Sequence, residues 1–437
     1  MKKWIAVLCL ILFPGILPAE QNWKAVMRYD KQAAKADLSK RLQKYAGIDS
    51  HIAAEQSTVP STKQQAAFAK DLAKELKHMG ASNVQVSKTG IVTAEIPATT
   101  RQPALVLALV AHLDTPAQTK AQTPQSHAKY VKGDLVLNKE KGIRLTEENS
   151  SQLLRAHGHD FLTADGLAPF GASSKAGLSI VMNLADYLLG NRSLQHGLIK
   201  IILLPDGPSH AGAEALDIAG LKADYAYVLA GSDLGEIANS NFNGRNFTAI
   251  FKGRRDVPLG QAISSNFADN VLMASDFHTL LPRYARPETT SGQQGFVTVD
   301  SILTQGNLTT VTGQIRAFNN ADLQNLTNQV SQAFNIIKSM YSKRAGAELS
   351  FQDVFSNVQG KMQADLLTHL EAALDKQDIS AKYISVRDNP DFAVLTSRGL
   401  PAVGFFTGVF HEGEPLEYAD VDIMEASQRA LLEDILN

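Results

Sequence analysis

Three runs of apolar residues constrain the fold of this chain more than any other feature. They cover residues 104–111, 197–204 and 225–229, and polar residues hardly interrupt them. Runs of this kind form strands that are buried on both faces of a sheet. Apolar residues recur at helical spacing over 62–79, and a mostly apolar helix is predicted over 176–189. Strands that alternate with helices predict an α/β layer structure.

The second half of the chain predicts a separate module. The whole chain has 437 residues, which is more than one ordinary domain contains. From residue 248 onward the pattern reads strand, helix, two strands, helix, strand, which is a compact α+β unit. We therefore predict one α/β domain from residues 20–247 and 358–437, with a mixed sheet flanked by helices. An inserted ferredoxin-like domain would span residues 248–357.

The first residues have the pattern of a secretory signal peptide. A basic start at Lys2 and Lys3 precedes a short apolar stretch, and Ala19 ends the segment before Glu20. A signal peptide over residues 1–19 predicts a periplasmic or secreted protein; a buried N-terminal helix is the alternative. Cys9, the single cysteine of the chain, lies in this segment, so the mature protein would have no thiol.

The charge balance argues against some partners. The chain has 42 basic and 44 acidic residues, for a net charge of −2. A chain without a basic excess is not expected to bind nucleic acid or an acidic membrane surface. No stretch after the signal segment predicts a membrane span.

The motif His112-Leu-Asp114 ends the first apolar run. Residues two apart on a strand point to the same side. Such a pair can present an imidazole to a metal and a carboxylate that orients the imidazole. A single histidine at a strand end is more often structural, so the motif needs support from other segments.

That support comes from the order of several further segments. They are Val59-Pro-Ser-Thr62, Thr163-Ala-Asp-Gly166, Phe170-Gly-Ala-Ser-Ser-Lys-Ala-Gly177, Leu204-Pro-Asp206, Asn241-Phe-Asn243, Pro287-Glu-Thr289 with Gly295-Phe296, and Phe405-Phe-Thr-Gly-Val-Phe-His-Glu412. Together they resemble peptidase T, the two-zinc aminotripeptidase, and its wider clan of exopeptidases. The resemblance spans the chain from about residue 38 to 424.

The resemblance implies a two-zinc hydrolase with five metal ligands and a glutamate base. In such sites two metals about 3.5–4 Å apart activate a water. His112 matches the first metal histidine, Asp114 its orienting carboxylate and His411 the second metal histidine. The other positions have changed: Ser173 stands for the bridging aspartate, Gly207 for the base, Pro208 for the ligand glutamate and Ala230 for the last aspartate.

These replacements predict that two-zinc hydrolysis is lost. Serine, proline and alanine cannot supply anionic oxygen to a dication, so we expect at most one zinc ion. A first hypothesis is an inactive homologue that binds a small peptide or a protein. The alternative is an active exopeptidase with a single-metal site built from His112, His411 and an acid such as Asp206. His210, Asp165 and Asp233 also flank the lost positions, although they equally fit surface turns.

The resemblance also implies substrate contacts and a partner. Arg316 matches an arginine that holds a substrate carboxylate, for which its forked side chain is suited, although an exposed structural arginine fits as well. Asn241 and Arg387 match further substrate-binding positions. The family's histidine of the insert falls at Val257, so that donor is replaced. The inserted domain resembles one that pairs subunits, which predicts a possible homodimer.

Overall fold

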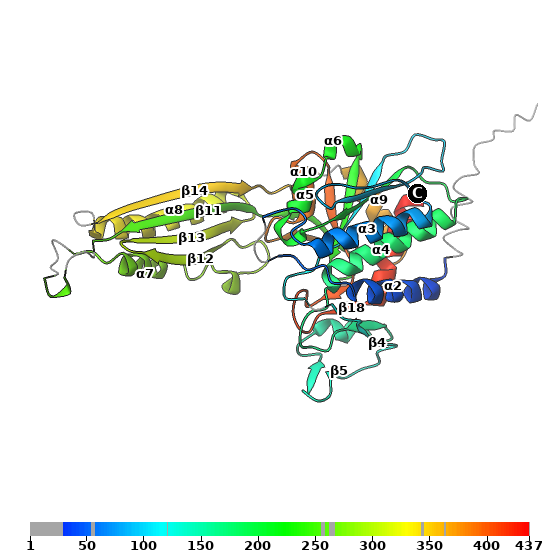
Figure 1. Cartoon of the computed structure of the whole chain (residues 1–437), viewed down its shortest axis with the longest axis horizontal. Coiled ribbons are helices and arrows are strands. Elements are labelled where there is room, and N and C mark those ends of the chain that lie inside the picture. Colours follow the sequence, from blue (N-terminus) through cyan, green and yellow to red (C-terminus); the bar gives the residue numbers. More distant parts are fainter. Residues whose placement is uncertain are drawn as a thin grey trace, which may run out of the picture.

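The structure is a computed structural model. It describes residues 29–53, 57–119, 121–254, 258–261, 267–341, 345–361 and 364–436. The predicted signal peptide and Val257 lie outside the described residues. The molecule is elongated, with a broad α/β part and a slender part that extends from one side of it (Figure 1). Within the described residues, no helix combines the length and apolarity that crossing a bilayer requires.

A mixed eight-stranded sheet forms the centre of the broad part. Its strand order is β1-β2-β8-β3-β9-β16-β10-β15, and β8, β3, β9 and β16 run parallel to one another. The bounds are β1 Ser82–Val86, β2 Val92–Ile96, β3 Leu107–His112, β8 Ile199–Leu204, β9 Tyr225–Gly231, β10 Glu236–Asn241, β15 Lys382–Val386 and β16 Ala402–Phe406. The predicted α/β architecture is confirmed.

Helices cover both faces of this sheet. One apolar core joins the sheet to α2, α3, α4, α9 and α11, and a second core joins the other face to α5, α6 and α10. The bounds are α2 Lys31–Ala46, α3 Lys63–Met79, α4 Ala172–Gly190, α5 Ala211–Ala215, α6 Ile218–Leu221, α9 Ala364–Asp375, α10 Asp391–Ser397 and α11 Val421–Leu436. Helix α3 follows the sequence closely: the Thr62 side chain accepts a hydrogen bond at its start, and Gly80 ends it in a left-handed conformation.

Strand β3 positions the end of the first apolar run. Leu107, Leu109 and Ala111 belong to the first core, whereas Ala108 and Val110 belong to the second. This alternation continues one residue further. It aims His112 toward the side of the sheet that carries α5, α6 and α10.

The inserted part is a four-stranded antiparallel sheet with two helices. Its elements are β11 Asn243–Lys252, η3 Leu259–Gln261, α7 Asn270–Leu280, η4 Pro287–Thr289, β12 Phe296–Gln305, β13 Leu308–Ala317, α8 Asn320–Tyr341 and β14 Gly346–Phe355. The strand order is β12-β13-β11-β14, and Phe251, Phe277 and Phe334 pack together between sheet and helices. Strand β11 begins at Asn243, so the insert starts before the predicted residue 248.

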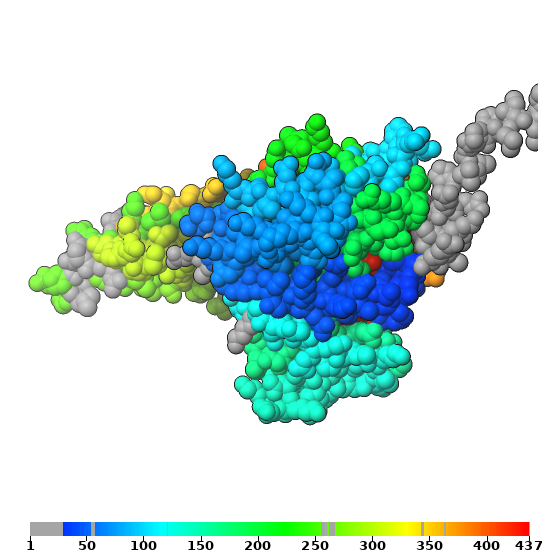
Figure 2. Space-filling view, turned by 45° about the vertical axis from the view of Figure 1, so that its right-hand side comes forward, coloured from blue at the N-terminus to red at the C-terminus, as the bar shows by residue number. Residues whose placement is uncertain are grey.

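Two small sheets complete the broad part. They have the orders β17-β18-β7-β4 and β5-β6, and they lie beside α2 at the lower edge of the molecule (Figures 1 and 2). The bounds are β4 Gln125–His127, β5 Leu135–Asn138, β6 Ile143–Leu145, η1 Ser151–Arg155, β7 Phe161–Thr163, β17 Val409–Phe410 and β18 Tyr418–Asp420. They bring the segment after β17, with His411, back toward the main sheet.

Candidate functional site

A pocket lies where the parallel strands β3, β8 and β9 end. Its volume is about 460 Å³, and such carboxyl-terminal edges commonly hold the ligand site of α/β sheets. Its lining includes five positions singled out from the sequence: His112, Ser173, Gly207, Pro208 and Ala230. The apolar wall opposite comes mainly from β9, β10, β15 and α10. The structure thus brings the retained histidine and the four replaced positions into one cavity.

His112 is held by a carboxylate that is distant in sequence. Its Nε2 lies 2.6 Å from Oδ2 of Asp391, the first residue of α10. Burial by itself would lower the pKa of His112, but the hydrogen bond and charge of Asp391, with Asp114 nearby, raise it to about 9. Asp114 is predicted to orient His112; in the structure, however, it accepts a hydrogen bond from the N–H of Gly207 at 3.0 Å. Asp391 is therefore the carboxylate that holds the Nε2 side of the ring.

Asp391 binds a second imidazole with its other oxygen. Nδ1 of His210 lies 2.6 Å from Oδ1 of Asp391. Burial would raise the pKa of Asp391, but the two histidines lower it to about 2. The carboxylate is buried and bridges His112 and His210, which come from β3 and from the turn after β8. We call these three residues the Asp391 cluster.

The turn after β8 is anchored so that it presents His210. Asp206 and His210 flank the short helix η2 Gly207–Ser209, and both have left-handed backbone with φ of 54° and 60°. Such conformations are costly for residues other than glycine. The Asp206 carboxylate is buried and accepts hydrogen bonds from Ser61 N, Ser61 Oγ and Gln65 Nε2. Asp206 thus holds the turn to the start of α3. Its carboxylate oxygens are occupied by these hydrogen bonds and are not directed at a metal site.

Gly207 leaves no room for the lost base. A Cβ at this position would lie 2.8 Å from Cδ2 of His112 and 3.3 Å from Oδ1 of Asp114. Real Cβ contacts are essentially never that short to a packed ring, so the imidazole occupies the space that a side chain here would need. The replacement of the base is therefore coupled to the position of His112.

His411 lies apart from the Asp391 cluster. Its Nδ1 is 3.1 Å from Oε2 of Glu414, its φ is 53°, and it is absent from the pocket lining, whereas its neighbour Glu412 is part of it. Burial and the nearby Glu417 raise the pKa of Glu412. Glu417 itself accepts backbone N–H groups at the start of α4, from Gly171 at 2.7 Å among others. A side-chain carboxylate thus already satisfies the helix end beside Ser173.

The three predicted substrate residues have structural contacts at the junction of the two parts. Asn241 is buried and binds Val358 N and Phe242 O. Arg387 donates to backbone oxygens of Thr290 and Gln294 in the insert and lies over the Phe296 ring. The Arg316 guanidinium lies over the ring of Phe355 in the insert, and its Nε is 3.7 Å from Oδ1 of Asp388. None of the three is in the pocket lining.

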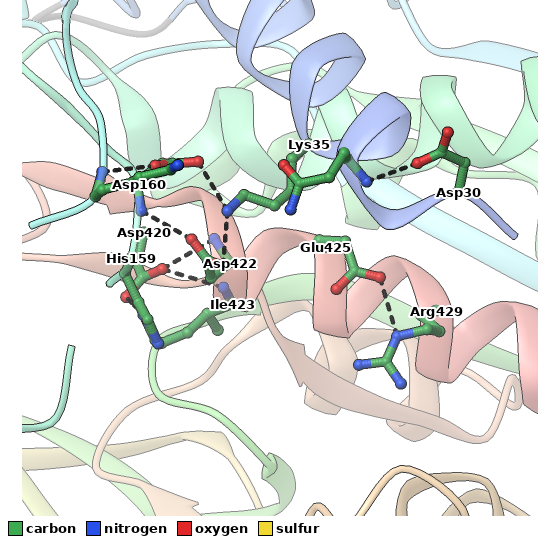
Figure 3. A network of polar contacts seen from close by, with 11 residues as sticks. Asp30, Lys35, His159, Asp160, Asp420, Asp422, Ile423, Glu425 and Arg429 are labelled. Carbon is green, nitrogen blue, oxygen red and sulfur yellow. Dashed lines mark hydrogen bonds and ion pairs between the residues drawn. The ribbon is translucent and has the colours of Figure 1, made fainter. Parts of the chain in front are cut away.

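A second histidine-carboxylate cluster lies under α2. Ligand atoms of His159, Asp420 and Asp422 fall within 4.8 Å of one another. Lys35 Nζ, however, lies 2.7 Å from both Asp160 and Asp422 (Figure 3). The remaining oxygens accept from His159 and from backbone N–H groups. A side-chain ammonium therefore provides the cation of this group, which we call the Lys35 cluster.

The pocket does not fit a pair of zinc ions. Two ligand atoms on one tetrahedral zinc would lie about 3.4 Å apart, whereas His112 and Asp391 are 2.6 Å apart, a hydrogen-bond distance. Within the described part of the chain, the Lys35 cluster is the one place where three such ligand atoms gather. The pocket contains no group of three. The residues at the replaced positions bear no carboxylate.

Solved structures place the fold among the M20 peptidases. An aminopeptidase PepT from Bacillus cereus superposes with a TM-score of 0.68 at 17% identity, covering 92% of this chain and 98% of its own. A dinuclear metal-binding M20 peptidase from Bacillus subtilis gives 0.60 at 15% identity, covering 93% and 98%. These likenesses establish an M20-type fold, a mixed sheet flanked by helices with a smaller inserted domain.

Sequence relatives narrow the class to one family. Peptidase T of Listeria welshimeri is 30% identical over 405 residues, covering 91% of this chain and 98% of the relative. Peptidase T of Bacillus cereus is also 30% identical over 405 residues, covering 91% and 97%. No family model matches the chain. This chain belongs to the peptidase T family.

Sequence reasoning missed the role of two residues. No local pattern marks Asp391 as the partner of His112, and His210 fits a turn residue. The usable signal is the histidine at position 210, two residues after Pro208. Nothing local in the sequence pairs residues that are 279 positions apart.

Proposed function

We propose that this chain is an exported peptidase T-like protein that binds a small peptide or a protein segment without two-zinc hydrolysis. The single observation that carries the proposal is the content of the pocket. His112 shares it with Ser173, Pro208 and Ala230, and none of these three can replace an acidic ligand. The pocket retains the size and apolar walls that suit a peptide side chain.

The loss of the base supports the same proposal. Hydrolysis by the family mechanism requires a proton acceptor for the attacking water. Gly207 has no side chain, and its neighbouring imidazole fills the adjacent space. Two of the carboxylates near the pocket already have partners, since Asp114 accepts a hydrogen bond from Gly207 and Asp391 holds two imidazoles.

A single-metal exopeptidase is the second candidate. Its motivating observation is that both metal histidines of the family, His112 and His411, remain. Asp206, the acid suggested for this site, would first have to release Ser61 and Gln65. The candidate predicts at least one tightly bound zinc and a melting temperature that falls with a chelator.

One experiment separates the two candidates. The purified mature chain is dialysed against zinc, cobalt or manganese, its bound metal is counted, and tripeptide hydrolysis is measured. We expect no metal-dependent turnover, and we expect calorimetry to detect binding of some members of a tripeptide set. Metal-dependent hydrolysis that His112→Ala abolishes would refute the proposal. His157→Ala, an exposed histidine outside the pocket, serves as the control.

Export and self-association extend the proposal. The basic start and apolar stretch of residues 1–19 support export to a periplasm or beyond. The insert, by its likeness to subunit-pairing domains, supports a homodimer. N-terminal sequencing of the protein from an exporting host and its mass in solution check these two points; an uncleaved N-terminus or a monomer would contradict them.

A further inference from the structure

The Asp391 carboxylate forms two short hydrogen bonds to histidines, and these bonds affect whether the pocket can bind a metal. Each oxygen of the Asp391 carboxylate binds a different imidazole, His112 at 2.6 Å and His210 at 2.6 Å. Asp391 and His112 are largely buried, and the exposed fraction of the Asp391 side chain is 2%. Charge-assisted hydrogen bonds of this length in a buried setting are strong.

The bond to Asp391 uses the part of His112 that a metal would need. A metal-bound histidine coordinates through one ring nitrogen and donates the other to a carboxylate. If Asp114 takes the second role, as the family resemblance implies, Nε2 is the coordinating nitrogen. In this structure Nε2 binds Asp391, and the adjacent Cδ2 side of the ring packs against Gly207.

We propose that Asp391 has taken the place of the metal ion at His112. Its carboxylate, rather than a cation, joins His112 to the turn after β8 through His210, and it thereby keeps zinc out of the pocket. This inference rests on the proposed absence of two-zinc hydrolysis, but it makes a separate claim about what excludes the metal.

Two features of the surrounding turn support the proposal. Asp206 fixes the turn to α3 through Ser61 and Gln65, so His210 is directed at Asp391 despite its left-handed backbone. Gly207 allows the His112 ring to approach the turn closely, which a larger residue would prevent. The glycine and the histidine of this turn thus both serve the Asp391 cluster, whereas the family resemblance implies glutamates at positions 207 and 208.

Zinc titration of the full mature chain tests the proposal. The metal-free protein and its Asp391→Ala variant are titrated with zinc alone by calorimetry. Loss of the carboxylate frees both imidazoles, so we expect the variant to bind zinc at least roughly tenfold more tightly than the native chain. Adding His112→Ala to the variant should remove the gain.

Asp388→Ala is the matched control. It removes the same charge three residues earlier, from an exposed side chain that approaches Arg316 at 3.7 Å. This control should bind zinc like the native chain. Equal affinity of the native chain and Asp391→Ala would overturn the proposal, and so would a folded Asp391→Ala variant that binds no zinc.

A measurement on the native chain keeps the proposal testable if the variant fails to fold. Proton–nitrogen NMR of the imidazoles reports whether Nε2 of His112 and Nδ1 of His210 carry hydrogen-bonded protons. We expect both signals, unchanged by excess zinc. Displacement of the His112 proton by zinc would overturn the proposal. If the chain hydrolyses no tripeptide but zinc displaces the His112 proton, only the proposed role of Asp391 is refuted. The proposed function would then still stand.

Discussion

The two histidine-carboxylate clusters of this protein reverse the usual expectation for a metal site. The Asp391 cluster lies in the pocket at the ends of β3, β8 and β9, yet its ligand atoms do not gather around one point. The Lys35 cluster lies away from that pocket, and its ligand atoms do gather, beside a lysine ammonium that pairs with Asp422 and Asp160. Convergence of ligand atoms therefore indicates a need for positive charge, which a side chain can meet as well as a metal.

The pKa shifts of the two central aspartates express the same difference. Asp391 faces two imidazoles, and although burial opposes the shift, its pKa falls to about 2. Asp420 faces one imidazole, and burial raises its pKa above the usual range. The Asp391 cluster is thus internally neutralised, whereas the Lys35 cluster depends on Lys35 for its balance.

The largest effect is expected from removing that lysine. Lys35→Met keeps the aliphatic stem but leaves Asp160 and Asp422 without their cation. A partner lost from a largely buried ion pair leaves an uncompensated charge, so we expect a cost of about 3 kcal/mol in unfolding free energy. Urea unfolding measures this, with Lys40→Met on the exposed side of α2 as control. Equal stability of the two variants would show that the Lys35 cluster does not depend on its cation.

The same variant sharpens the comparison with metal. Without Lys35, a divalent cation should raise the melting temperature of the variant and leave the native protein unchanged, because only the variant would offer an open cation site.

A smaller effect is expected in the pocket. Gly207→Glu restores a carboxylate at the family's base position, but its Cβ would lie 2.8 Å from the His112 ring. Overpacking of this kind costs about 2 kcal/mol, and we expect no tripeptide hydrolysis. Chemical unfolding and a peptidase assay check both points. Pro208→Glu, at the exposed neighbouring position, should cost less; restored hydrolysis in Gly207→Glu would show that the pocket still accepts the family chemistry.

The smallest effect is a pH dependence in the Lys35 cluster. The hydrogen bond to Asp420 raises the pKa of His159. A raised histidine pKa stabilises the folded protein fully below the unfolded value of about 6.5, and this contribution is lost as the pH rises through the folded value. His159→Gln should therefore lower the melting temperature more at pH 5.5 than at pH 9.5. An equal loss at both pH values would mean that the Asp420 contact does not depend on the charge of His159.

Much of the fold could be predicted from local pattern. The apolar runs became β3, β8 and β9, and helix α3 begins after Thr62 and ends before Gly80 as its spacing implies. The sequence pattern predicts a start of the insert at residue 248, later than β11 begins, because the first residues of that strand are polar or glycine and have no apolar pattern. Sequence resemblance also grouped His112 with Ser173 and Ala230, and these residues share one pocket.

The amino-acid sequence was enough to indicate the family, the α/β architecture and the absence of acidic side chains at positions 173, 207, 208 and 230. These follow from residue identity and from periodicity, both of which are local. The tertiary structure alone decided what occupies the space: Asp391 reaches His112 across 279 residues, and Lys35 reaches Asp422 across 387. Such pairings arise when buried charges must find partners in the folded chain, and no local pattern records which partner is near.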